Sequence, residues 1–193
     1  MITKKSVVRC FGDNDALYAQ YHDTEWGRPV HDDHKLFESL MLESMQSGLS
    51  FLTVLKKRDN YRAAFDHFHI PTVAQMSDSD LEHLCQNPGI IRHRGKIFSL
   101  SRSARICQEI QRDFGSLRNY FWSYIHDQPT DNPWLLACQV PSSTPVSEQI
   151  SQDLRKRGMI YIGPTSVYAF MQAVGMVNDH LRDCWVRGEK NHF

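Results

Sequence analysis

Residues 154–175 read LRKRGMIYIGPTSVYAFMQAVG, and this stretch indicates the kind of fold that the chain adopts. One helical segment ends in the basic residues before Gly158, and a second helical pattern runs from Pro164 to Val174. Proline suits the first turn of a helix, because its missing N–H would have no partner there. The stretch therefore predicts two helices joined by a short hairpin, with Gly163 at the entrance to the second helix.

Two helices joined in this way have the layout of a helix-hairpin-helix, a motif that holds DNA by its backbone. Gly163 lets another molecule approach the chain closely, and the free N–H groups around Thr165, in the first turn, can hold a phosphate. An ordinary pair of packed helices has the same spacing. The stretch thus predicts the helices and leaves DNA binding as one of two interpretations.

Helical periodicity also dominates the rest of the chain. Apolar residues recur every three or four positions from residue 97 to residue 114, which is one continuous helix face. A capping box of Ser77 and Asp80 opens another helix, and no stretch of four or more residues alternates convincingly. Loops are expected near Pro71, at 87–89 and at 131–133. Further helices are predicted over residues 15–26, 32–46, 117–125, 146–157 and 164–174.

These patterns predict an all-α protein. A single domain is expected over residues 1–193, or two helical subdomains on either side of the proline-rich segment 128–145. With 41% hydrophobic and 23% charged residues, the composition is that of an ordinary globular protein. No apolar run approaches the ~18 residues of a membrane span, and residues 1–10 are too short and polar for a secretory signal. The five cysteines are widely spaced, so reduced thiols and a cytoplasmic location are expected.

The charge balance argues against a protein that coats nucleic acid. The 22 Lys and Arg residues equal the 22 Asp and Glu residues in number. Basic residues do cluster at 56–58, 92–96 and 155–157. A protein can bind DNA locally with only a few cations that contact phosphates, so the clusters are compatible with DNA binding. Solvated helix ends explain the same clusters equally well.

Four residues near the two ends of the chain are candidate metal ligands. His180 and Cys184 lie four residues apart, so they share one face of a helix. Cys10 and His22 would complete the Cys₂His₂ set that a tetrahedral structural zinc accepts. The spacings are not those of a standard zinc finger, and the chain has ten histidines. A surface histidine and a half-buried cysteine are the alternative.

Glu43 and Leu49 stand out within the segment LFESLMLESMQSGLSF, residues 36–51. Glu43 lies at the edge of an apolar helix stripe, where a carboxylate either forms a structural ion pair or faces a functional cleft. After it, residues 46–50 break the helix and place Leu49 in a turn. An apolar residue on a loop can serve as a wedge in a DNA stack, or it can begin the next buried helix.

Read together, these stretches resemble the 3-methyladenine DNA glycosylase I (Tag) family. The likeness runs in order from Cys10 to about Cys184, and its two longest motifs, YHDxEWG and GIIRHRGKI, are specific. The matching stretches are residues 18–27, 42–50, 53–58, 60–63, 89–97, 170–173 and 178–180.

The resemblance implies a helix-hairpin-helix glycosylase fold with a structural Zn²⁺ that joins the N- and C-terminal segments. The implied activity is flipping and hydrolytic excision of 3-methyladenine from alkylated double-stranded DNA by a monofunctional enzyme, expected to be monomeric, which leaves an abasic site. The sequence departs from the family pattern at Phe51, where tryptophan is usual, at Met45, and in a Cys10-to-His22 spacing that is one residue short. The implied residues are Cys10, His22, His180 and Cys184 for zinc, Tyr21, Glu43 and Phe51 for the base, Gly48, Leu49, Gly163 and Thr165 for DNA, and Glu43 for catalysis.

Three other functions fit the same motifs. A helix-hairpin-helix protein without catalysis would bind damaged and undamaged duplexes alike. A glycosylase for another cationic base, such as 7-methylguanine, would differ only in the base that it releases. A zinc-dependent hydrolase would leave one metal position open for water.

Overall fold

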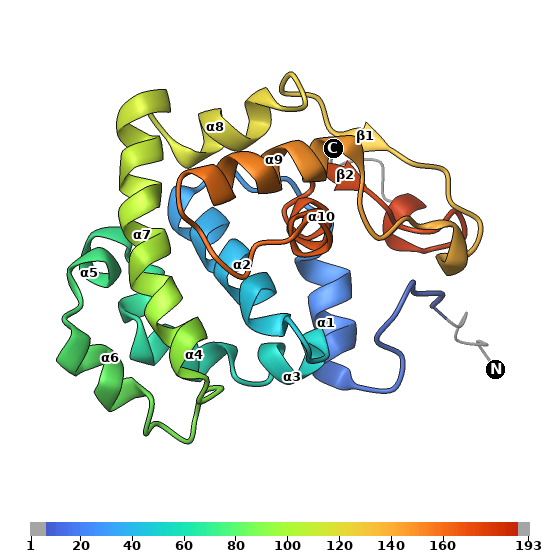
Figure 1. Ribbon diagram of the computed structural model, residues 1–193. Helices are drawn as coiled ribbons and strands as arrows, with labels where there is room; N and C mark the ends of the chain where they lie inside the picture. Colours follow the sequence, from blue (N-terminus) through green and yellow to red (C-terminus); the bar gives the residue numbers. More distant parts are fainter. Residues whose placement is uncertain (1–6, 189–193) are drawn as a thin grey trace.

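The computed structural model describes residues 7–188, and the fold is mostly helical (Figure 1). Residues 1–6 and 189–193, which the predicted single domain includes, lie outside the described residues. The elements are α1 (Ala16–Thr24), α2 (Asp33–Gln46), α3 (Phe51–Leu55), α4 (Arg58–Ala64), η1 (Asp66–Phe68), α5 (Ile70–Gln75), α6 (Asp78–Leu84), α7 (Arg94–Phe114), α8 (Leu117–Ser123), β1 (Thr130–Asp131), η2 (Ala137–Gln139), α9 (Pro145–Lys156), α10 (Pro164–Ala173), β2 (Val177–Asn178) and η3 (Val186–Gly188).

Helix α2 forms the middle of the molecule. It packs against α3, α7, α8 and α10, and α9 lies against α10 (Figure 1). Residues 40–45 of α2 are buried without interruption, so the helix has almost no solvent-facing side in its second half. A helix that is surrounded in this way is the natural support for a residue that must be held away from water.

The predicted helix boundaries are confirmed by local capping. Asp15 and Asp32 cap α1 and α2 through their carboxylates, and Ser77 with Asp80 forms the predicted capping box of α6. The predicted apolar face of α7 is buried except at its last member, Phe114, which is 40% exposed. Helix α7 ends at Gly115, whose φ of 84° needs glycine.

One sequence-based expectation is wrong, and the all-α prediction is confirmed with a small exception. The loop predicted near Pro71 is instead the first turn of α5. A proline is tolerated there, because the N–H groups of the first turn have no partner within the helix. The fold is also not purely helical, because Thr130 and Asp131 pair in parallel with Val177 and Asn178. This short pair ties the proline-rich segment to the chain beyond α10, and strands of two residues give no periodic signal in a sequence.

Helices α9 and α10 are joined by residues 157–163, as the opening stretch predicts. Met159 and Ile162 of this connection are buried, and Ser151 of α9 donates a hydrogen bond to the Ile162 carbonyl at 2.8 Å. The connection is therefore fixed to the core rather than loose. Across the part of the chain that the structure describes, no helix has the length and apolar character needed to cross a bilayer.

Candidate functional site

A cavity of about 280 Å³ opens between α1, α2, α3 and α10. Tyr21 of α1, Glu43 of α2 and Phe51 of α3 all line it, so the structure brings together the three residues predicted to bind a base. The segment around η2 and the chain beyond β2 complete the wall. The volume of the cavity is just below the range of roughly 300–1,000 Å³ found for small-molecule pockets.

Aromatic rings make one side of this cavity. The ring of Tyr21 lies 5.1 Å from that of Phe51 between centroids and 6.4 Å from that of Tyr18, which is stacked on it. Phe51 is placed by the N-cap of α3, where the Ser50 hydroxyl accepts from the Thr53 N–H at 3.3 Å. Aromatic faces attract cations, so this wall suits a flat, positively charged ring.

Glu43 is a buried carboxyl group, and no cationic side chain pairs with it within residues 7–188. It is 4% exposed, and its Oε2 has no hydrogen-bond partner among the described residues. Burial raises the pKa of Glu43 to about 8, so the group carries its proton at neutral pH. The structural ion pair that the sequence leaves open as an alternative is not formed among the described residues. A carboxyl with a strongly perturbed pKa at a cavity is typical of a functional site.

The turn after α2 places Leu49 at the surface. Gly48 has a φ of 80°, which favours glycine, and Leu49 is 42% exposed. Lys96 of α7 holds this turn from inside, since its ammonium donates to the carbonyls of Met45 at 2.9 Å and Ser47 at 2.6 Å. Sequence reasoning placed Lys96 in a basic surface cluster, but the side chain is buried at 5% exposure. The role of Lys96 in holding this turn is evident only from its contacts with the Met45 and Ser47 carbonyls, which lie far away in the sequence.

The N-terminus of α10 carries Gly163 and Thr165. Gly163 is the N-cap residue, with a φ of −87° that any residue can adopt. A Cβ at this position would meet nothing within 4 Å. Neither backbone strain nor packing among the described residues thus requires a glycine here, and Thr165 is exposed in the first turn.

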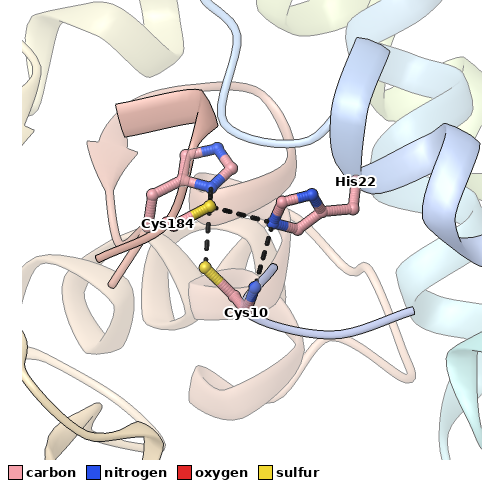
Figure 2. A group of neighbouring side chains, drawn as sticks. Cys10, His22 and Cys184 are labelled. Atoms are coloured by element: carbon pink, nitrogen blue, oxygen red, sulfur yellow. Dashed lines mark hydrogen bonds between the residues drawn. The ribbon is translucent and has the colours of Figure 1, made fainter. Parts of the chain in front are cut away.

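Cys10, His22, His180 and Cys184 form one cluster despite the short spacing between the first two. Their ligand atoms all lie within 4.8 Å of one another, and Figure 2 shows Cys10, His22 and Cys184 pointing toward a common centre. The Cys184 sulfur lies 3.4 Å from His22 Nε2 and 3.5 Å from His180 Nδ1, and the Cys10 sulfur lies 3.6 Å from His180 Nδ1. A tetrahedron with zinc-to-ligand lengths of about 2.3 Å (sulfur) and 2.0 Å (nitrogen) has sulfur-to-nitrogen edges of about 3.5 Å.

The second nitrogen of each histidine is also occupied. His22 Nδ1 lies 2.9 Å from Asp23 Oδ1, and His180 Nε2 lies 3.2 Å from the carbonyl oxygen of Trp26. Metal-binding histidines usually have such partners, which fix the ring orientation. Asp23 is itself held by Arg9 and by the indole of Trp185, so the N-terminal and C-terminal parts of the described chain meet around the cluster. The donor set can therefore hold a metal ion with four protein ligands.

Comparison with known proteins agrees with these features. The methyladenine glycosylase family model matches residues 11–187. DNA-3-methyladenine glycosylase 1 of Escherichia coli (strain K12) is 45% identical over 170 residues, which cover 88% of this chain and 91% of that protein. DNA-3-methyladenine glycosylase of Haemophilus influenzae is 42% identical over 169 residues, with coverage of 88% and 91%.

Solved structures give the same result. A crystal structure of 3-methyladenine DNA glycosylase I (TAG) superposes with a TM-score of 0.90 at 45% identity, covering 92% of this chain and 98% of that one. A Staphylococcus aureus TAG structure on 3-methyladenine recognition superposes with a TM-score of 0.89 at 37% identity, covering 92% and 94%. The fold is thus shared with these proteins over most of the chain, and the chain belongs to the methyladenine glycosylase family.

Proposed function

We propose that this protein is a monofunctional DNA glycosylase that excises 3-methyladenine from alkylated double-stranded DNA and leaves an abasic site. The observation that carries the proposal is Glu43, a buried carboxyl in an aromatic cavity, without a cationic partner among the described residues. The relatives named DNA-3-methyladenine glycosylase support it, being 42–45% identical over most of the chain.

The cavity suits a base that has left the duplex. An enzyme cannot reach a stacked base, so the nucleotide must rotate into a pocket at a cost of a few kcal/mol. Methylation at N3 gives the adenine a positive charge, which the faces of Tyr21 and Phe51 attract by roughly 0.5–2 kcal/mol. Unmodified adenine lacks this charge, and the aromatic wall gives it no comparable stabilisation.

Glu43 supplies the opposite charge only when a cation arrives. The carboxyl is protonated at neutral pH because burial raises its pKa to about 8. A cationic base beside it favours the ionised form, so binding of the base releases the proton of Glu43. The carboxylate then accepts hydrogen bonds from the base edge. Because the cationic adenine is already a good leaving group, Glu43 need not activate the attacking water.

The DNA contacts follow from two elements beside the cavity. Leu49, raised on the Gly48 turn, would fill the gap that the flipped nucleotide leaves in the stack. The α9–α10 pair would act as a helix-hairpin-helix, with backbone N–H groups near Thr165 on a phosphate. The open space at Gly163, which the fold itself does not use, supports a close approach of the DNA backbone there.

The four-ligand cluster would hold a structural Zn²⁺. Two thiolates and two imidazoles at tetrahedral edge lengths suit this ion, and four protein ligands leave no position for a catalytic water. Zinc would supply folding free energy at this site and take no part in base excision. Thiol ligands persist in a reducing compartment, which agrees with the cytoplasmic location expected from the sequence.

We further propose that the protein acts as one domain and as a monomer. One contiguous hydrophobic core runs from Leu36 to Val177, which supports a single domain, and the monomer is the state expected from the sequence. No lysine lines the cavity within residues 7–188, so strand cleavage through a lysine intermediate is not expected.

The test is base release from methylated duplex DNA, with free 3-methyladenine, 7-methylguanine and adenine separated and quantified. Selective release of 3-methyladenine, reduced at least tenfold in Glu43→Gln, is the expected result. Release of 7-methylguanine instead would favour a different lesion. A zinc-loaded, folded protein that releases no base and binds damaged and undamaged duplexes alike would overturn the proposal in favour of a non-catalytic DNA-binding protein.

A further inference from the structure

Asp179 is a second buried carboxyl group at the cavity, and the sequence patterns did not single it out. It is 2% exposed, follows β2 directly and lines the same cavity as Glu43. Unlike Glu43, it is fully hydrogen-bonded. Its Oδ1 accepts from Asn132 Nδ2 at 2.8 Å and Trp134 Nε1 at 2.7 Å, and its Oδ2 accepts from Tyr168 Oη at 2.6 Å and Gln172 Nε2 at 2.8 Å.

These contacts fix the orientation of the Gln172 side chain. A carboxylate only accepts hydrogen bonds, so the amide must turn its NH₂ group toward Asp179. Gln172 also lines the cavity, and within residues 7–188 no donor occupies its Oε1. The cavity is therefore offered a carbonyl oxygen rather than an NH₂ group. The amide is held through its NH₂ group by the buried hydrogen-bond network around Asp179, which makes its Oε1 a preorganised acceptor.

We propose that Gln172, oriented by Asp179, determines which alkylated purine the site accepts, by receiving a hydrogen bond from the exocyclic amino group of an adenine. The inference rests on the proposed glycosylase function. Charge recognition by Glu43 and the aromatic wall does not distinguish 3-methyladenine from 3-methylguanine, because both carry the N3 methyl group and a positive charge in DNA. Guanine has a carbonyl oxygen where adenine has its amino group, and two acceptors facing each other leave both unpaired.

Asp179→Asn tests this directly, because the structure dictates how the new amide must lie. The indole N–H of Trp134 can only donate, so it keeps the carbonyl oxygen of the new side chain on its own side. The new NH₂ group then faces Gln172, whose amide must rotate to accept from it. In this variant Gln172 turns its NH₂ group toward the cavity, which suits guanine and not adenine.

The measurement is the ratio of 3-methyladenine to 3-methylguanine released from one methylated duplex. We expect Asp179→Asn to lower this ratio about tenfold or more, since a matched hydrogen bond is replaced by a mismatched one. Gln172→Met, which removes the acceptor but keeps the length of the side chain, should lower the ratio through slower release of 3-methyladenine alone.

Trp134→Phe is the matched control. It removes a donor from the other oxygen of Asp179 and leaves Gln172 in place, so the ratio should stay at the wild-type value. Zinc content is measured for each variant because Asp179 adjoins His180. If Asp179→Asn loses zinc, the release ratio of Gln172→Met alone tests the inference. A wild-type ratio in zinc-loaded Asp179→Asn or in Gln172→Met would overturn the inference. Failure of the wild-type protein to release either base would instead count against the proposed function.

Discussion

At the scale of single residues, the cavity contains two buried carboxyl groups with opposite surroundings. Asp179 accepts from donors on both oxygens, whereas Glu43 has an oxygen without any partner among the described residues. Ionising Glu43 in this environment is costly, and the folded state therefore holds its proton to about pH 8. A residue kept in this state lowers the stability of the fold, which is the expected mark of a group retained for binding.

Glu43→Gln should accordingly be stabilising at alkaline pH. In the unfolded chain the carboxyl ionises near pH 4.5, and in the folded chain near pH 8, so between these values the unfolded state binds fewer protons. The wild-type free energy of unfolding therefore falls as pH rises through this window, by at most about 5 kcal/mol. Denaturant unfolding of both proteins at pH 5 and pH 8 measures the effect. Equal differences between the two proteins at both pH values would show that Glu43 ionises normally.

Phe51 is the position in the aromatic wall that can take a larger ring. It is half-buried, its ring centroid lies 5.1 Å from that of Tyr21, and it also lines a second cavity. Phe51→Trp should tighten binding of free 3-methyladenine roughly three- to tenfold, because a larger ring offers more stacking surface to the base. Titration calorimetry measures the affinity. An unchanged or weaker affinity would mean that the base does not stack on this residue.

At the scale of elements, buried Lys96 joins α7 to the C-terminal end of α2. Its ammonium is a positive charge beside the last carbonyls of that helix, where the helix dipole favours it, and it has no carboxylate partner among the described residues. Lys96→Met should cost about 1–3 kcal/mol, because two carbonyls lose a charged donor. Duplex binding should weaken more than binding of free 3-methyladenine, since the Leu49 turn is released while the cavity wall remains. Equal losses in the two affinities would argue that Lys96 has only a general structural role.

A substitution at Gly163 can test the DNA-binding role of the α9–α10 connection without a large change in the stability of the protein. Alanine fits its φ of −87° and would contact nothing within 4 Å, so Gly163→Ala should cost less than about 1 kcal/mol in unfolding free energy. A methyl group at this point would hold a DNA phosphate away from the N-terminus of α10. We expect duplex affinity to fall at least fivefold with no change in binding of free 3-methyladenine. Undiminished duplex affinity would place the DNA elsewhere.

Sequence patterns predicted the elements well where the information is local. Capping residues and apolar periodicity set the boundaries of α1, α2 and α10, and the start of α6, to within about two residues. Residues whose role depends on distant partners were misread or missed. The basic cluster at 92–96 indicates a surface charge at Lys96, because its carbonyl partners lie some fifty positions earlier in the chain, and the sequence marks Gln172 only as part of a family motif.

At the scale of the whole molecule, the two ends of the chain depend on one another. The Trp185 N–H donates to the Val8 carbonyl at 3.0 Å, and the Leu181 N–H donates to the sulfur of Cys10 at 3.2 Å. Cys10 and Leu181 also line the cavity. The cluster of Cys10, His22, His180 and Cys184 therefore closes one wall of the proposed base site.

Removal of the metal should loosen the terminal segments and lower thermal stability. Each kcal/mol of lost stability lowers the Tm of a domain of this size by roughly 2–4 °C, and a closed four-ligand zinc site contributes several kcal/mol, so we expect Tm to fall by roughly 6 °C or more. Chelation followed by calorimetry and elemental analysis gives the shift and the stoichiometry, with one zinc per chain expected. Cys10→Ser should reproduce the chelated state, whereas Cys138→Ser, at an exposed thiol outside the cluster, should change neither Tm nor zinc content. Inhibition by chelator at an unchanged Tm would identify an open catalytic metal, and the structural role of this cluster would have to be abandoned.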